Sequence, residues 1–197
     1  KKALMQQLLT GKKRLHDHTG QPFAGEWNIT LLDNAFTFSR GSSQEKVEKG
    51  QFELIGMGSI SEDGRLLVEH KTNSPQCLLQ KNQLVMPERD IGKGLIIGRT
   101  AIIDCNHKYV LGANVQSLSL KNINEHYPLF WNYLFNSTIF RQKFQRIVNG
   151  TGQLMITGKE IKKLTVCVPE LEEQQKIAAV LTATDNEIDT LKQKLDH

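Results

Sequence analysis

Apolar residues near the C-terminal end of the chain recur in alternating steps of four and three residues. They are Ile177, Leu181, Ile188, Leu191 and Leu195, with the polar Thr184 filling the gap between Leu181 and Ile188. This is the spacing of a coiled-coil helix, in which the apolar side chains line one seam and pack against a partner. Pro169 can open such a helix, and the glutamates that follow it suit the positive end of the helix dipole. The pattern predicts a long helix over 169–197 with a seam for a partner, and the alternative is that this helix folds back on its own domain.

A shorter apolar stripe lies at the opposite end of the chain. Leu4, Leu8 and Leu15 share one side of a predicted helix within residues 1–15, and Gly11 with the basic residues after it is typical of a helix C-terminus. The alternative is a frayed surface helix. The His-Asp-His run at 16–18 lacks the further ligands that a metal ion needs, so we interpret it as part of a polar linker.

The segment between the two helices predicts many short strands joined by glycine-bearing turns. We expect strands at 52–57, 66–68, 83–86, 95–98, 101–103, 115–120 and 164–168, and a short helix or strand within 26–38. Residues 124–148 have helical spacing with a break at Asn136 and Ser137. Their aromatic side chains are expected in the core, with a platform for stacked bases as the alternative. The predicted fold is α+β: a compact domain with a strongly bent, mostly short-stranded sheet and packed helices, plus the long coiled-coil-type helix.

Composition narrows the class of protein. The chain has 197 residues, of which 39% are apolar, enough for one medium domain with an appendage. We find no apolar run of membrane-spanning length and no signal-peptide pattern. Cys77, Cys105 and Cys167 are far apart and lie in apolar stretches, which predicts reduced, buried thiols and a cytoplasmic location rather than a disulfide frame or a zinc site.

Charge is unevenly distributed along the chain. The net charge is +4, but the segment from residue 170 onward carries seven acids and three bases, so the remainder has 22 bases against 14 acids. An acidic helix beside a basic body predicts two kinds of partner, protein along the helix and a polyanion against the body.

Several basic and polar residues on predicted loops could contact DNA. Arg and Lys reach phosphates, Arg can bind guanine with two hydrogen bonds, and Ser, Thr, Asn and Gln commonly contact other base edges. The segment 137–163 alone carries six bases against one acid. Asn114 and Gln116 belong to the same group of polar residues. The main candidates are Arg40, Ser42, Ser43, Lys46, Arg65, Arg89, Lys93, Arg99, Thr151, Gln153 and Lys159.

Signatures of catalysis are weak. The chain has no complete phosphate-binding loop, no Gly-x-Ser-x-Gly elbow and no Asn/Asp-Pro-Pro-Tyr run for methyl transfer to adenine. Glu160 and Lys162 could form half of a nuclease metal site, but they lack a convincing acid upstream, and a solvated helix start is the simpler interpretation. We therefore expect no catalytic residues and no metal. The alternatives are a coiled-coil interaction protein without a DNA role and a small metal-dependent nuclease.

Three stretches of the chain resemble the specificity subunits of type I restriction–modification systems. The run Pro-Glu-Leu-Glu-Glu-Gln-Gln-Lys-Ile at 169–177 matches the start of their conserved helix, and 4–15 resembles the far end of the same kind of helix. The Gly-Thr-Gly-Gln run at 150–153 and the segment 55–64 are also similar to the family. The resemblance implies three parts: 1–19 as a helix end and linker, 20–168 as a DNA-binding target recognition domain, and 169–197 as the start of the spacer helix.

The resemblance also implies a function and partners. Such a subunit is non-catalytic, and each of its two recognition domains reads one half of a bipartite site in double-stranded DNA. Modification subunits dock on it and carry S-adenosylmethionine, so this chain itself is expected to bind no cofactor, and restriction subunits complete the complex. Leu4 and Leu8 would join the C-terminal seam in helix contacts. The chain resembles half a subunit, either a C-terminal half or a half-length form, and two copies joined through their helices would mimic the whole.

Overall fold

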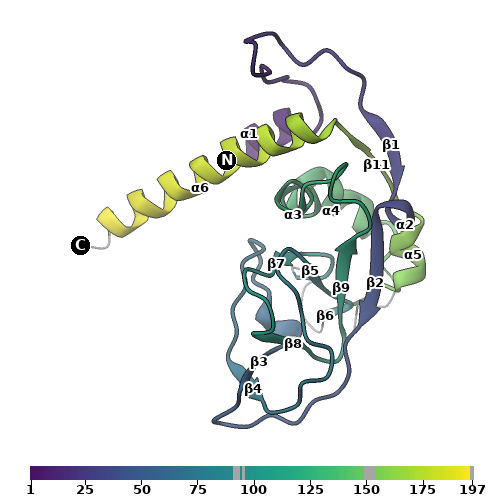
Figure 1. The fold of residues 1–197 in the computed structure, drawn as a ribbon, viewed down its shortest axis with the longest axis vertical. Coiled ribbons are helices and arrows are strands. Elements are labelled where there is room, and N and C mark those ends of the chain that lie inside the picture. Colours follow the sequence, from purple (N-terminus) through teal and green to yellow (C-terminus); the bar gives the residue numbers. More distant parts are fainter. Residues whose placement is uncertain (91–93, 95, 149–153, 196–197) are drawn as a thin grey trace.

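The long C-terminal helix leaves the body of the molecule and extends past it (Figure 1). The computed structural model describes residues 1–197 apart from 91–93, 95, 149–153 and 196–197. The helices are α1 (Lys2–Leu8), α2 (Leu32–Ala35), the 3₁₀ turn η1 (Met57–Ser59), α3 (Pro128–Asn136), α4 (Thr138–Gln145), α5 (Gly158–Lys162) and α6 (Leu171–Leu195). Helices and strands alternate irregularly, so the predicted α+β class is confirmed.

The strands of the described residues form four small sheets rather than one bent sheet. The largest has the antiparallel order β2-β9-β5-β7, made of β2 (Phe36–Arg40), β9 (Val115–Leu120), β5 (Leu84–Pro87) and β7 (Ala101–Ile102). A second sheet has the order β4-β3-β8, made of β4 (His70–Thr72), β3 (Phe52–Ile55) and β8 (Tyr109–Leu111). Two antiparallel pairs complete the set: β1 (Asn28–Leu31) with β11 (Thr165–Val168), and β6 (Arg89–Asp90) with β10 (Leu154–Met155).

The central sheet separates two hydrophobic cores. Alternate residues of a strand face opposite sides, and in β5 Leu84 and Met86 join the core beneath the helices, whereas Val85 joins the core shared with the three-stranded sheet. The aromatic residues of α3 and α4 fill the first core, as predicted, with Phe130 and Phe140 fully buried. The predicted helix break is also confirmed, because the Ser137 side chain accepts a hydrogen bond from the backbone of α4 and caps it.

The seam of α6 is divided between the interior and solvent. Ile177 and Leu181 lie in this chain's own core at 1% and 0% exposure, whereas Leu191 and Leu195 are 53% and 85% exposed. Leu8 of α1 is also fully buried, and α1 contacts α6 and α4. A partner helix cannot reach Leu8, Ile177 or Leu181. The first half of α6 therefore packs on its own domain, which is the alternative given for this helix in the sequence analysis.

Other expectations are corrected by the structure. Cys77, Cys105 and Cys167 are all exposed rather than buried. Cys167 points outward because it alternates with Val166 and Val168, which take the buried side of β11. Residues 66–68 contribute only an isolated bridge instead of a strand. Residues 96–98 form a turn that Gly98 closes with φ +71°, and Leu95 of the predicted strand lies outside the described residues.

None of the helices in the described ranges combines the length and the apolar character that crossing a bilayer requires. In the same ranges, no three or more His, Cys, Asp or Glu side chains lie where they could hold one metal ion.

Candidate nucleic-acid interface

Two adjoining hollows with basic walls lie where β2, β9, β6 and α5 meet. Their volumes are about 530 and 330 Å³, and they share Arg40 and Thr157. Five bases line them against two acids, and we call this surface the basic cleft. Its charged residues are Arg40, Arg89, Lys159, Lys162, Lys163, Asp33 and Glu88.

The floor of the basic cleft is formed by the pairing of β2 with β9. Arg40 is opposite Gln116 in this antiparallel register, and opposite residues present their side chains on the same face of a sheet. Phe38, two residues earlier, shares that face and lines the larger hollow. Asn114 lines the smaller hollow just before β9 begins. A cation, an aromatic ring and two carboxamides are therefore gathered on one surface.

One wall of the basic cleft is the short helix α5. Its start is fixed by a reciprocal cap, in which the Thr157 hydroxyl accepts from the Glu160 backbone and the Glu160 carboxylate accepts from the Thr157 backbone. Gly158 lies against the amide oxygen of Gln116, so that a Cβ there would be 3.4 Å from it. Glu160 is thus engaged in the helix cap, and the nuclease interpretation loses its proposed metal ligand.

The charges around the basic cleft are only partly neutralised. Arg40 Nε lies 2.9 Å from a Glu88 oxygen, and Lys162 Nζ lies 3.2 Å from an Asp33 oxygen. No ion pair recorded among the described residues involves Arg89, Lys159 or Lys163. Positive charge therefore remains available to a polyanion at this surface.

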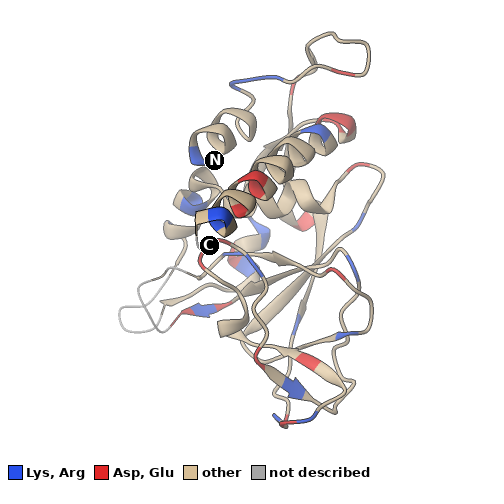
Figure 2. Ribbon diagram, turned by 90° about the vertical axis from the view of Figure 1, so that its left-hand side faces the viewer, with Lys and Arg blue, Asp and Glu red and all other residues tan. Residues whose placement is uncertain are grey.

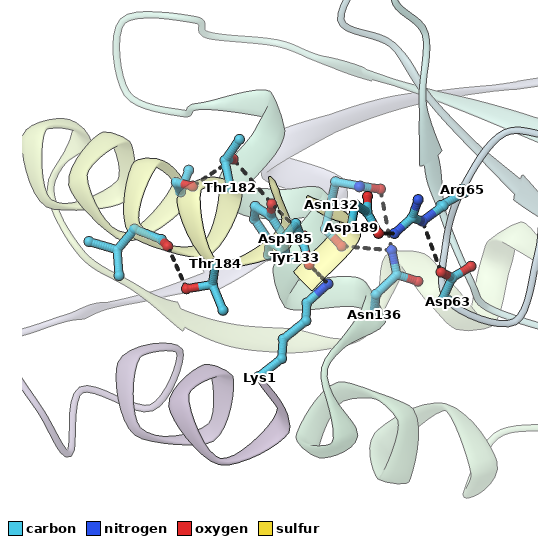
Figure 3. Close-up of polar contacts among 12 residues, drawn as sticks. Lys1, Asp63, Arg65, Asn132, Tyr133, Asn136, Thr182, Thr184, Asp185 and Asp189 are labelled. Carbon is cyan, nitrogen blue, oxygen red and sulfur yellow. Dashed lines mark hydrogen bonds and ion pairs between the residues drawn. The ribbon is translucent and has the colours of Figure 1, made fainter. Parts of the chain in front are cut away.

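Other predicted DNA contacts lie elsewhere. Arg65 binds Asp63 at 3.0 Å and Asp189 of α6 at 2.7 Å, which ties the 61–65 turn to the long helix (Figure 3). Arg99 donates to the Asn136 carbonyl at 2.9 Å and is partly buried beside α3. Both arginines line a separate hollow beneath α6, so the structure does not bring them together with the basic cleft.

The same polar network holds the middle of α6. The Tyr133 hydroxyl of α3 donates to Asp185 at 2.9 Å and lies 3.1 Å from the Thr182 hydroxyl, while Lys1 Nζ lies 2.5 Å from Asp185 (Figure 3). Burial raises the pKa of Tyr133 to about 12, because the charged phenolate would be poorly solvated there. These contacts fix the direction in which α6 leaves the body.

Arg141, one of the six bases of 137–163, also forms hydrogen bonds within the protein rather than facing a ligand. Its guanidinium donates to the Ile97 carbonyl and to the Gly94 carbonyl, the latter at 2.8 Å. Burial, together with the nearby Arg99, lowers its pKa to about 10. Arg141 therefore holds Gly94 and the turn at 96–98 against α4.

The remaining candidates are scattered or lie outside the described residues. Ser42 forms a bridge with Gly112 and accepts a hydrogen bond from Gln44, and Ser43 is exposed in the following segment. Lys46 lines a different hollow, next to β3 and β4. Bases accordingly appear over several parts of the ribbon (Figure 2). Lys93, Thr151 and Gln153 fall outside the described residues.

The basic cleft brings together three of the eleven main candidates, Arg40, Arg89 and Lys159. It also contains Asn114 and Gln116, the two polar residues grouped with them in the sequence analysis. The selection missed Lys162 and Lys163, although the basic run that follows Glu160 already pointed to them. Phe38 was missed as well. The predicted element within 26–38 ended at Phe38 and left Arg40 in a loop, whereas in the structure β2 continues to Arg40 and puts both side chains on one face.

Solved structures share this architecture of a mixed globule that carries a long helix. The HsdS subunit from Thermoanaerobacter tengcongensis aligns with a TM-score of 0.66 at 18% identity over 98% of this chain. The S subunit of a type I restriction–modification system from M. genitalium aligns with a TM-score of 0.64 at 19% identity over 85% of this chain. A structure that addresses complex assembly and conformational transition of the type I system gives 0.69 at 16% identity over 98%. At such identities the likeness establishes the fold.

The class of protein follows from the sequence family. The model of the type I restriction modification DNA specificity domain matches residues 26–197. The chain belongs to this family, which confirms the resemblance seen in the sequence. It spans less than half of the solved relatives, at 45%, 41% and 47% of their lengths. Among curated protein sequences, none matches.

Proposed function

We propose that this chain is a non-catalytic DNA-binding module that reads one half of a bipartite site for a type I restriction–modification enzyme. The observation that carries the proposal is the basic cleft, in which unneutralised cations surround a floor of polar side chains. Lys159 and Lys163 would anchor phosphates, which position a duplex, while side chains of the floor would contact base edges, which specify its sequence. Family membership supports the same role.

The partners of the proposed complex follow from the same family. The far end of α6, with Leu191 and Leu195 exposed and Ile188 partly buried, would dock modification subunits or the helix of a second copy, since apolar helical positions in solvent favour burial against another helix. S-adenosylmethionine would be bound by the modification subunit, and restriction subunits would add cleavage in the cytoplasm. A coiled-coil protein without a DNA role remains the alternative that the experiment must exclude.

Salt-dependent binding to duplex DNA tests the proposal. Each phosphate contact contributes about −0.9 to the slope of log affinity against log salt concentration. Replacing both Lys159 and Lys163 with Ala should therefore flatten the slope by about 2 and weaken binding to every duplex alike. The matched control replaces Lys12 and Lys13, which are equally charged, exposed and outside the basic cleft.

Fluorescence anisotropy with a labelled random-sequence duplex, measured over a series of salt concentrations, gives both slopes. The proposal is supported if only the variant in the basic cleft flattens the slope. Equal effects of the two double variants would show that binding is spread over the whole basic body. Absence of binding by the unmodified chain would favour an interaction protein without a DNA role.

A further inference from the structure

Arg40 is held through the Nε atom of its guanidinium, and most of its side chain is exposed to solvent. Its Nε donates to Glu88 at 2.9 Å, yet the side chain is 67% exposed. The hydrogen bonds and ion pairs recorded among the described residues give its two terminal amino groups no protein partner. An arginine oriented in this way presents two parallel donors at a fixed angle.

The carboxylate that orients Arg40 is itself firmly placed. Glu88 lies between β5 and β6 and is 13% exposed. Its backbone amide donates to the Asn114 carbonyl at 2.9 Å, and its carbonyl accepts from the Ile156 amide at 3.0 Å. Because neighbouring segments hold the Glu88 backbone on both sides, its carboxylate forms a rigid support for the arginine.

The backbone next to Arg40 is fixed as well. Gly41 follows it directly, and a Cβ at Gly41 would lie 2.0 Å from the Gly112 carbonyl oxygen. The Gly41 amide also donates to the Val115 carbonyl at 3.0 Å. The end of β2 is thereby pinned against β9, and the ordering of Arg40 is largely complete before any ligand arrives.

Charge separates the role of Arg40 from that of the lysines. The Glu88 carboxylate neutralises the guanidinium and would repel a phosphate, whereas no ion pair recorded among the described residues involves Lys159 or Lys163. What Arg40 keeps is directional hydrogen bonding. Two parallel donors match the O6 and N7 acceptors that guanine presents in the major groove, and no other base offers that pair.

Gln116 completes the arrangement. It lies opposite Arg40 in the strand register and is 1% exposed, and within the described part of the chain its side chain forms one recorded hydrogen bond, to the Met86 sulfur at 3.8 Å. Sulfur is a weak acceptor, so the carboxamide is poorly satisfied where it lines the larger hollow.

We propose that Arg40, positioned by Glu88, is a specificity-determining residue that reads a guanine through O6 and N7. This inference rests on the proposed DNA-binding function and names the base that one point of the basic cleft recognises. A bidentate contact of this kind discriminates against a wrong base by about 5- to 150-fold.

The test selects duplexes from a random library with the full chain and then replaces residues one at a time. Arg40→Lys keeps the charge but replaces the planar pair of parallel donors with a flexible ammonium group, so the preference for a guanine in the selected sequence should weaken while the salt slope stays unchanged. Glu88→Gln should weaken the same preference, because the guanidinium loses its charged support. Replacing that guanine with 7-deazaguanine should lower the affinity of the unmodified chain more than it lowers the affinity of Arg40→Lys. Lys159→Ala serves as the control and should weaken binding without changing base preference.

The outcomes separate the two proposals. If Arg40→Lys keeps the guanine preference while Lys159→Ala still weakens binding, the assignment of Arg40 is overturned and the DNA-binding function stands. If the unmodified chain selects no duplex, both are overturned. Because Arg40 is exposed, its variants are expected to fold, and circular dichroism checks this.

Discussion

The ion pair between Arg14 and Glu173 joins the segment that follows α1 to the first turn of α6. Arg14 Nε and Nη2 donate to the two carboxylate oxygens of Glu173 at 2.7 and 2.8 Å, and Trp27 Nε1 donates to one of them at 3.3 Å. The Glu173 side chain is 2% exposed. Replacing Arg14 with Ala would therefore leave a buried carboxylate with the indole as its remaining side-chain donor.

The expected cost follows from that geometry. Breaking a buried ion pair by removing one partner costs about 3–5 kcal/mol. Arg14 itself is 25% exposed, and Trp27 still donates, so we expect about 2–3 kcal/mol of lost unfolding free energy. For a chain of this length each kcal/mol lowers Tm by about 2–4 °C, which predicts a fall of about 4–12 °C.

Urea unfolding followed by circular dichroism measures this loss, with Arg65→Ala as the matched control. Arg65 also ties α6 to the body, but its side chain is 51% exposed and that of its partner Asp189 is 35% exposed. Such a pair is worth about 0–1 kcal/mol. If Arg14→Ala costs no more than Arg65→Ala, burial is not what makes the Glu173 ion pair important, and the reasoning is refuted.

Three further predictions concern the seam of α6, the buried Tyr133 of α3 and the close approach at Gly41. Leu181→Ala should lower the free energy of unfolding, measured with urea, by about 2–5 kcal/mol because the side chain is fully buried. Leu195→Ala should change it by no more than about 0.5 kcal/mol because that side chain is exposed. Equal losses would contradict the division of the seam between interior and solvent. Burial raises the pKa of Tyr133 to about 12 from 10.0, so the folded state keeps the phenol proton longer, and its contribution to stability is present below pH 10 and lost between pH 10 and 12. Tyr133→Phe should flatten that alkaline decline in urea midpoints, and parallel curves would argue against it. Gly41→Ala should lower the free energy of unfolding by about 1–3 kcal/mol, because its Cβ would lie 2.0 Å from the Gly112 carbonyl oxygen. Gly25→Ala, with open space around it, should leave that free energy unchanged. An unchanged free energy for both variants would count against the close approach at Gly41.

The helices were largely predictable because their signals are local. The predicted break at Ser137 is confirmed, and the caps formed there and by Thr157 with Glu160 each involve residues only three apart. Strands were less predictable, since a strand exists only where a distant partner pairs with it. Residues 66–68 have strand-like composition but find only one bridge partner.

The candidate site likewise combines features that the sequence predicts with others that depend on distant contacts. Composition singled out arginines and lysines on loops, but could not say which of them share a surface. Arg40 and Lys159 lie on one cleft because β2 pairs with β9 and α5 packs against α2 beside them. Arg65, equally plausible in the sequence, turns to Asp189 of α6 instead.

By itself, the sequence determined the length and periodicity of the helices, the basic character of the body and the family to which the chain belongs. Only the tertiary structure decided that Ile177 and Leu181 are interior while Leu191 and Leu195 face solvent. It also decided that Glu88 supports Arg40. The physical reason is that periodicity, caps and net charge depend on residues close in the chain, whereas burial and ion pairing depend on which distant segments meet.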